Sequence, residues 1–221
     1  MMKQFGIRVE QTENCYEIAH QEGWGLTEYE VEPDVSASCY FYAMVPLLKT
    51  SVIVKGVQEK SLQGDIQFLN VLEQMGCQKE KTPEGIRLTM KEPEMHGVDI
   101  SMKDFSDQTM TLAALAPFAD RVTRIHNIGH IRLQESDRLS AIAKELTKMG
   151  IRVEEGEDFL VIYPGIPQPS LVSTYEDHRM AMAFSLIGLR SEGIVIDNPL
   201  CCKKTFEEYF SLLDQIIKEH R

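Results

Sequence analysis

The chain has 221 residues, 43% of them hydrophobic, so it is long enough to bury a full core. Its formal net charge of -11 argues against a nucleic-acid partner, because phosphate backbones bind to basic protein surfaces. The sequence shows no signal peptide and no membrane-spanning run, and its five cysteines include no CxxC pair. We therefore expect a cytoplasmic globular protein without a membrane partner, in which any anion site is a local basic cluster.

In chain order, the first pattern is a repeat with a spacing of about seventy residues. Each copy has the end of a helix, a glycine, a polar strand, a turn and a second strand. The three copies cover residues 2–18, 72–88 and 145–162, and their glycines are Gly6, Gly76 and Gly150. A glycine after a helix favours the left-handed conformation that ends it, so we expect three helix-then-hairpin units.

A second repeated block lies before each hairpin. An aspartate at an expected helix start precedes an almost wholly apolar run: Asp34 before VSASCYFYAMVPLL, Asp107 before QTMTLAALAPFA, and Asp177 before HRMAMAFSLIGL. A helix that is apolar all round is a buried helix, and an aspartate in this place is by default an N-cap. A strand follows each run (51–57, 121–128, 192–199), and an amphipathic helix comes next. The unit is βαβαββ, which predicts an α/β protein with buried helices and outer sheets.

The phase of the repeat predicts the domain boundary. The chain opens within a hairpin that has no buried helix before it, and it closes on an amphipathic helix, residues 206–218, that has no hairpin after it. We therefore expect residues 1–33 to be the final hairpin of a preceding, mostly absent domain. Residues 34–221 are expected to form the C-terminal domain, with nearly three complete units.

The stretch NIGHIRLQESDR, residues 127–138, is a connector before a helix and is rich in charged and titratable side chains. Its charged or titratable side chains are His130, Arg132, Glu135, Asp137 and Arg138. The apolar spacing that follows predicts a helix start at Ser136 or Asp137, whose first turn offers free N–H groups beside Arg138. A small anion binds readily in such a place, although a capped helix with solvated arginines explains the same residues.

Four segments in order resemble the C-terminal domain of the 5-enolpyruvylshikimate-3-phosphate (EPSP) synthase family. They are SDQTMTLAALAPFA, NIGHIRLQESDRLSAIAKELTKMGIRVEEGEDFLVIYP, YEDHRMAMAFSLIGL and CCKKTFEEYF, and the resemblance covers essentially the whole chain. It implies the inside-out α/β fold of the enolpyruvyl transferases, with two domains of three βαβαββ units and an active site between them. The implied reaction, part of the shikimate pathway of aromatic amino acid biosynthesis, moves the enolpyruvyl group of phosphoenolpyruvate to the 5-hydroxyl of shikimate 3-phosphate and releases phosphate. It needs no metal or organic cofactor.

The resemblance places three cations on the positions that bind phosphoenolpyruvate: Arg138 in ESDR, Arg179 in DHR and Lys204 in KKTF. A ligand with a phosphate and a carboxylate needs several cations, preferably arginines that bind in bidentate fashion. Each of the three lies at a junction before a helix, in a different part of the repeat. All three can therefore face one end of the domain.

By the same resemblance, Asp107 accepts the proton of the shikimate hydroxyl and Glu135 handles the methylene proton. His130 and Gln134 fall where the family contacts shikimate 3-phosphate, and His178 falls beside the bound substrate. From the residues alone, Asp107 is an N-cap, Glu135 a first-turn carboxylate favoured by the helix dipole, and His178 a packed polar side chain.

Some residues lie outside this assignment or depart from the pattern. Lys203 is expected to be solvated, and Arg132 is expected to pair with a neighbouring carboxylate, Glu135 or Asp137. Gln134 stands where the family usually has a lysine, which removes one fixed charge beside the shikimate site.

Two alternatives remain open at the level of sequence. The sister family that transfers enolpyruvate to a UDP-amino sugar shares the fold, and a non-catalytic isolated domain is also possible. We expect the chain alone not to turn over, because the missing N-terminal domain would supply half of the cleft. Its expected partners are that domain, phosphoenolpyruvate and shikimate 3-phosphate.

Overall fold

A computed structural model describes residues 1–220 of the chain, which divides into two compact units between Pro33 and Asp34. The smaller unit contains the 3-10 helix η1 (Met2–Phe5) and the antiparallel hairpin β1 (Val9–Thr12) and β2 (Cys15–Ile18). Gly6 ends η1 at φ 77, so the expected left-handed turn is confirmed. The assignment of this unit to a preceding domain stays a prediction.

The larger unit starts with the first copy of the repeat. Its elements are α1 (Val35–Leu48), β3 (Ser51–Lys55), the 3-10 turn η2 (Gly64–Gln67), α2 (Phe68–Gln74), β4 (Cys77–Lys81) and β5 (Gly85–Met90). The three strands form an antiparallel sheet in the order β3-β5-β4. The hairpin therefore folds back onto the strand that follows the buried helix.

The second copy contains the whole predicted unit. Its elements are β6 (Asp99–Ser101), η3 (Ser106–Gln108), α3 (Thr109–Leu115), η4 (Ala116–Phe118), β7 (Thr123–His126), η5 (Gly129–Leu133), α4 (Arg138–Lys148), β8 (Val153–Glu155) and β9 (Phe159–Ile162). The sheet order is β6-β7-β9-β8, with β6 parallel and β9 antiparallel to β7. The order strand, buried helix, strand, helix, hairpin is confirmed here.

The third copy follows the same order as far as its second helix. Its elements are β10 (Ser170–Val172), α5 (His178–Ser185), η6 (Leu186–Leu189), β11 (Ile194–Ile196), η7 (Pro199–Lys204) and α6 (Tyr209–His220). The strands β10 and β11 pair in parallel. The helix expected from residue 206 begins at Tyr209, because the 3-10 turn η7 ends at Lys204 and residues 205–208 form a further turn before the helix.

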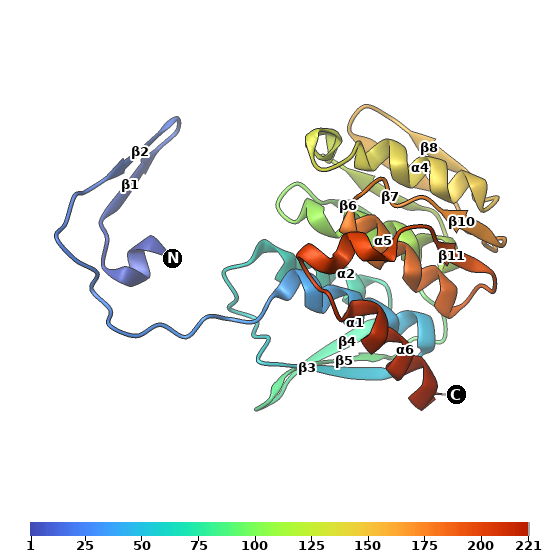
Figure 1. Cartoon of the computed structure of the whole chain (residues 1–221), viewed down its shortest axis with the longest axis horizontal. Coiled ribbons are helices and arrows are strands. Elements are labelled where there is room, and N and C mark those ends of the chain that lie inside the picture. Colours follow the sequence, from blue (N-terminus) through green and yellow to red (C-terminus); the bar gives the residue numbers. More distant parts are fainter. Residues whose placement is uncertain (221) are drawn as a thin grey trace. The chain divides into compact units, whose positions relative to one another are not determined.

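The core lies where the three apolar helices α1, α3 and α5 meet. All seven residues of α3 are buried, and α3 packs against both α1 and α5. Figure 1 shows β3, β4 and β5 on one side of the larger unit and β8 on the opposite side, with α1 and α5 between them. The predicted arrangement of helices inside and sheets outside is therefore confirmed.

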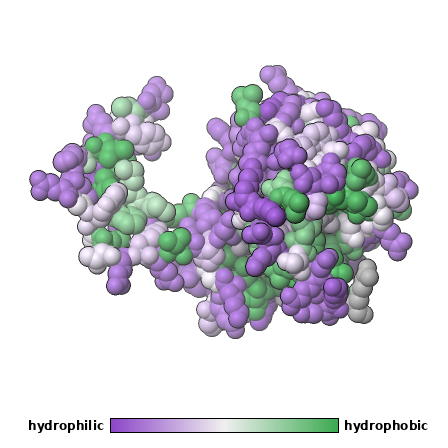
Figure 2. Space-filling model, in the orientation of Figure 1, coloured by the Kyte–Doolittle hydropathy of each residue, from purple (hydrophilic) through white to green (hydrophobic). Residues whose placement is uncertain are grey.

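The outer helices have one apolar face. In α4 that face includes Leu139, Ile142 and Leu146, which are fully buried at helical spacing. Figure 2 shows mostly hydrophilic residues on the visible face of the larger unit, with smaller hydrophobic areas among them. Within residues 1–220, none of the helices combines the length and the apolarity needed to cross a bilayer.

Candidate functional site: a charge cluster at the starts of the buried helices

The three buried helices start close to one another. The Arg179 Nη1 atom, in the first turn of α5, donates to Ser36 Oγ in the first turn of α1 at 2.5 Å. Gln108, the residue before α3, donates from Nε2 to the same hydroxyl at 3.0 Å. Polar side chains are gathered here because the interiors of the helices are apolar and only their ends can carry charge.

The aspartates at these three helix starts make different contacts. Asp34 caps α1 by accepting from the Ala37 N–H at 2.9 Å, and Asp177 caps α5 by accepting from the Arg179 N–H at 2.9 Å. Asp107 instead lies within the 3-10 turn η3, and no side chain caps α3 in the described chain. The N-cap interpretation is therefore right for two copies and wrong for Asp107, whose carboxylate is left for other contacts.

Arg138 lies at the centre of the cluster, with a side chain only 3% exposed. Its Nε donates to Asp177 Oδ2 at 2.7 Å, and its Nη1 donates to Asp107 Oδ1 at 3.0 Å and to Gln134 Oε1. Asp177 is fully buried, so this ion pair is shielded from water. The guanidinium is thereby fixed between two carboxylates that come from different copies of the repeat.

Arg179 binds the other side of Asp107. Its Nη2 lies 2.8 Å from Asp107 Oδ2, so each oxygen of this carboxylate pairs with a different arginine. The side chain of Asp107 is 34% exposed and borders an open pocket of about 200 Å³ that Asp65, Lys103 and Gln134 also line. A substrate hydroxyl in that pocket would lie beside Asp107.

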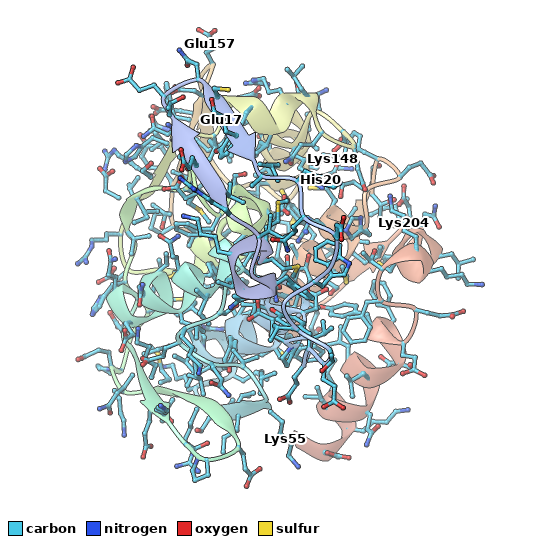
Figure 3. The ribbon with its side chains drawn as sticks, turned by 90° about the vertical axis from the view of Figure 1, so that its left-hand side faces the viewer. Glu17, His20, Lys55, Lys148, Glu157 and Lys204 are labelled. Atoms are coloured by element: carbon cyan, nitrogen blue, oxygen red, sulfur yellow. The ribbon has the colours of Figure 1, made fainter. Side chains whose placement is uncertain are left out.

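The second part of the cluster is built around Glu135. The Lys204 Nζ donates to Glu135 Oε1 at 2.8 Å, and the His178 Nδ1 lies 2.9 Å from Glu135 Oε2. The side chain of Lys204, labelled in Figure 3, extends from η7 and is 52% exposed. His178 Nδ1 is also 3.9 Å from Asp177 Oδ1, which connects this part to Arg138.

We call this group of seven side chains the charge cluster; its members are Asp107, Glu135, Arg138, Asp177, His178, Arg179 and Lys204. The two remaining predicted site residues border it. Gln134 contacts Arg138, and His130 Nε2 lies 2.8 Å from the Ser106 hydroxyl next to Asp107. The structure therefore brings together all eight predicted site residues, while their roles stay predictions.

Burial and neighbouring charges shift the pKa values of three side chains in the charge cluster. Burial opposes ionisation of Asp177, but the hydrogen bond and charge of Arg138 outweigh it and hold the pKa of that carboxyl below its ordinary value. The pKa of Glu135 is likewise lowered, because Lys204 and His178 outweigh its burial. Burial lowers the pKa of His178 although Glu135 acts against it, so the ring is neutral at pH 7. A carboxylate only accepts, so His178 Nδ1 carries the hydrogen.

Three residues of the site were not expected from the sequence. Asp177 was expected to cap a helix, and it does so while also binding Arg138. Ser36 accepts hydrogen bonds from α5 and from the residue before α3. Asp65 lies nearby, where burial raises the pKa of its carboxyl, with Arg179 acting against this shift and Asp107 adding to it. Adjacency to Arg179 in the DHR motif was a usable signal for Asp177, whereas Ser36 and Asp65 had none.

The charged neighbours left outside the site behave as expected. Arg132 pairs with Asp137 at 2.9 Å and with Glu155 at 2.7 Å, so it ties the connector to strand β8. Of its two expected partners, Arg132 binds Asp137, whereas Glu135 binds His178 and Lys204. Lys203 is exposed beside Lys204, in agreement with a solvated side chain.

Three donors in the cluster have the spacing of a metal site. Oxygen atoms of Glu135 and Asp177 and a ring nitrogen of His178 all lie within 4.8 Å of one another. Here, however, the two carboxylates already bind the Lys204 ammonium and the Arg138 guanidinium. A metal ion would have to compete with two fixed cations, so this donor set favours ion pairs.

Fold and site together define an α/β protein of repeated units with buried helices, in which arginine, lysine and acidic side chains meet at the helix starts. Residues 1–213 match the family model described as EPSP synthase (3-phosphoshikimate 1-carboxyvinyltransferase). The chain belongs to this family.

Individual relatives agree with the family assignment. The chain is 43% identical over 220 residues to a 3-phosphoshikimate 1-carboxyvinyltransferase of Nostoc punctiforme, covering 99% of this chain and 51% of that protein. It is 41% identical over 219 residues to 3-phosphoshikimate 1-carboxyvinyltransferase 2 of Halalkalibacterium halodurans, covering 98% and 49%. The chain thus spans about half the length of these relatives.

A solved structure shows the same fold. The EPSP synthase of Acinetobacter baumannii superposes with a TM-score of 0.81 at 22% identity, covering 97% of this chain and 52% of that one. This likeness extends over nearly the whole chain, so the inside-out α/β architecture is that of the family.

Proposed function

We propose that this chain forms the C-terminal part of an enzyme that transfers the enolpyruvyl group of phosphoenolpyruvate to the 5-hydroxyl of shikimate 3-phosphate, with release of phosphate. The observation that supports it is the convergence of Arg138, Arg179 and Lys204 with Asp107 and Glu135 at one end of the domain. A substrate with a phosphate and a carboxylate needs several cations, preferably arginines, and this cluster holds three of them in place. The enzyme would be cytoplasmic and would act in the shikimate pathway.

In this proposal the acids hold the cations in position until substrate arrives. The phosphate and carboxylate of phosphoenolpyruvate replace Asp107 and Glu135 as acceptors for Arg138, Arg179 and Lys204. Because the protein has already fixed the orientation of the cations, little reorganisation is needed when charge develops in the reaction. The buried Asp177 keeps its contact with Arg138 throughout, since it is not exposed to the ligand.

Asp107 and Glu135 then carry the proton transfers. Asp107 accepts the proton of the 5-hydroxyl as that oxygen bonds to the central carbon of phosphoenolpyruvate. The bound anion takes Lys204 away from Glu135 and adds negative charge beside it, so Glu135 takes up a proton from solvent on binding and delivers it to the methylene carbon. The tetrahedral intermediate breaks its bond to phosphate when Glu135 takes a proton back from the methyl group, and Asp107 returns the hydroxyl proton to the departing phosphate. His178 lies 2.9 Å from Glu135 and orients this carboxylate. These roles use no metal and no organic cofactor.

An NMR titration of the chain tests the anion half of the site. Phosphoenolpyruvate, shikimate 3-phosphate and both together are added while signals of Arg138, Arg179 and Lys204 are followed. We expect shifts at those three positions with phosphoenolpyruvate, and larger ones with both ligands. Absence of shifts at millimolar ligand, both in this chain and in a protein that joins it to the N-terminal half of a relative, would overturn the proposal.

We also propose that the 221-residue chain does not turn over by itself and needs a second domain as its partner. The support is that the chain spans about half the length of relatives with the named activity. In a phosphate-release assay, we expect the chain alone to match the blank. Turnover close to that of a full-length relative would disprove this statement.

A further inference from the structure

Glu145 is a buried carboxylate that the proposed chemistry does not use. It lies on α4 and is 1% exposed. The repeat shows that the fold does not require a charge here. A Met-Gly pair follows α2 as it follows α4, and the residue four positions before that methionine in α2 is Val71, also 1% exposed. Because burial of a carboxylate is costly, its presence in the second copy calls for a specific partner.

Those partners lie in the segment that leads into α5. Tyr175 Oη donates to Glu145 Oε1 at 2.6 Å, and the Ser173 N–H donates to Glu145 Oε2 at 3.1 Å. Lys148, one turn further along α4 and labelled in Figure 3, pairs with the same Oε2 atom at 2.5 Å and donates to the Leu171 carbonyl at 2.9 Å. Burial and the Glu145 carboxylate both raise the pKa of Tyr175, so its hydroxyl stays a donor.

The segment held in this way has an unfavourable backbone. Tyr175 and Glu176 have φ values of 55 and 57, and two consecutive left-handed residues other than glycine need support from their surroundings. A second support comes from the other side, where the Thr174 N–H donates to Asp197 Oδ1 at 3.0 Å. The next residue after this turn is Asp177, the partner of Arg138.

The helix α4 therefore contacts the segment at two points. Arg138, its first residue, binds Asp177, and Glu145, two turns later, binds Tyr175 and Ser173. We propose that Glu145 is a positioning residue: by holding the left-handed turn at Tyr175, it sets Asp177 against Arg138 and so fixes the guanidinium that binds phosphoenolpyruvate. The role of that guanidinium rests on the proposed function, whereas the coupling from Glu145 to Arg138 does not.

The test uses Tyr175→Phe and Glu145→Gln in the whole chain, with two readouts. The first is the rate at which the Arg138 Nε–H proton exchanges with water, measured by NMR. The second is the affinity for phosphoenolpyruvate. We expect both variants to speed the exchange and to weaken the affinity by about tenfold, the effect of one lost hydrogen bond to a charged group. Tyr175 is 37% exposed, so its variant keeps the fold if Glu145→Gln does not.

A matched control pair joins Glu154 in strand β8 to Tyr163, the residue after strand β9. Tyr163 Oη donates to Glu154 Oε1 at 2.7 Å, the same pair of groups at nearly the same distance but away from α5. Tyr163→Phe and Glu154→Gln should leave both readouts unchanged. If Tyr175→Phe and Glu145→Gln lower only the urea midpoint of unfolding and leave Arg138 exchange as in the original chain, Glu145 is merely structural and the inference is wrong.

The two proposals fail in different ways. If the original chain does not bind phosphoenolpyruvate but the variants still speed Arg138 exchange, the positioning role stands and the anion site is called into question. If the chain binds phosphoenolpyruvate and neither readout responds to the variants, the anion site stands and the positioning role is wrong.

Discussion

At the scale of single residues, Asp107 differs from the equivalent aspartates of the repeat because it does not cap a helix. Its counterparts Asp34 and Asp177 cap helices, whereas both of its oxygens face arginines. We expect Asp107→Asn to lower turnover by about 10²- to 10⁴-fold in a complete two-domain enzyme, the range associated with loss of a general base. Phosphate release measures this effect.

Asp34→Asn is the control for that prediction, because asparagine caps a helix about as well as aspartate does. It should leave turnover nearly unchanged, although it makes the same chemical change near the same place. Equal rates for the two variants would remove Asp107 from the catalytic assignment.

The Arg138–Asp177 pair should matter for stability as well as for binding. Replacing Arg138 by leucine leaves the fully buried Asp177 carboxylate without its main counter-charge. We expect the free energy of unfolding in urea to fall by about 3 kcal/mol or more, as when one partner of a buried pair is removed. Arg87→Leu, which breaks an exposed pair with Glu80, should have little effect.

A double variant separates charge from packing. Arg138→Leu combined with Asp177→Asn should recover part of the lost stability, because no uncompensated charge stays buried. If the double variant is as unstable as the sum of the single changes, loss of packing rather than charge dominates at this site.

At the scale of elements, the sequence alone predicted the order and the environment of the helices. The apolar runs after Asp34, Asp107 and Asp177 became the buried helices, and each predicted hairpin formed. These features depend on local periodicity and on the positions of glycines, both of which can be read directly from the sequence. The start of α6 was placed too early, because the 3-10 turn η7 and the residues after it precede that helix.

The contacts between elements could not be predicted in the same way. Arg138 binds carboxylates 31 and 39 positions away, and Lys204 binds Glu135 across 69 positions. No periodicity specifies such pairs, because they depend on how separate copies of the repeat pack. The resemblance to a family named the site residues, but it did not indicate that Arg138 would be buried between two acids.

A prediction at this scale concerns the helix α3. Leu112 is fully buried at its centre, so Leu112→Ala removes apolar contacts on several sides and leaves a cavity. We expect the free energy of unfolding to fall by about 2–5 kcal/mol, measured by urea denaturation. Ile166→Ala, at a side chain that is 82% exposed, is the control and should change stability little.

At the scale of the whole molecule, the cluster makes stability depend on pH. The pKa values of Asp177 and Glu135 are lowered by folding from ordinary values of 3.8 and 4.5, and that of His178 is lowered from 6.5. In each case the unfolded chain binds the proton at a higher pH than the folded chain does. The stabilisation that each group gives the folded state is therefore present above its ordinary pKa, and it is lost as the pH falls through its pKa in the folded chain.

Urea denaturation between pH 7 and pH 3 measures this dependence. We expect stability to begin to fall below pH 6.5 because of His178, and to fall further below pH 4.5 because of the carboxylates. In His178→Gln the first part of the decline should be smaller and the second part should persist. A flat profile between pH 6.5 and pH 4.5 in the unaltered chain would contradict the burial of a neutral imidazole.

The convergence of the three helix starts also bears on how such a site can arise. Three copies of one building block, arranged about a common point, present equivalent positions to the same small volume. Asp34 and Asp177 are the caps of α1 and α5, whereas α3 starts through the 3-10 turn η3, which leaves the Asp107 carboxylate to contact the two arginines. In a repeated fold, one copy can therefore present an acid at the common centre without losing a helix cap.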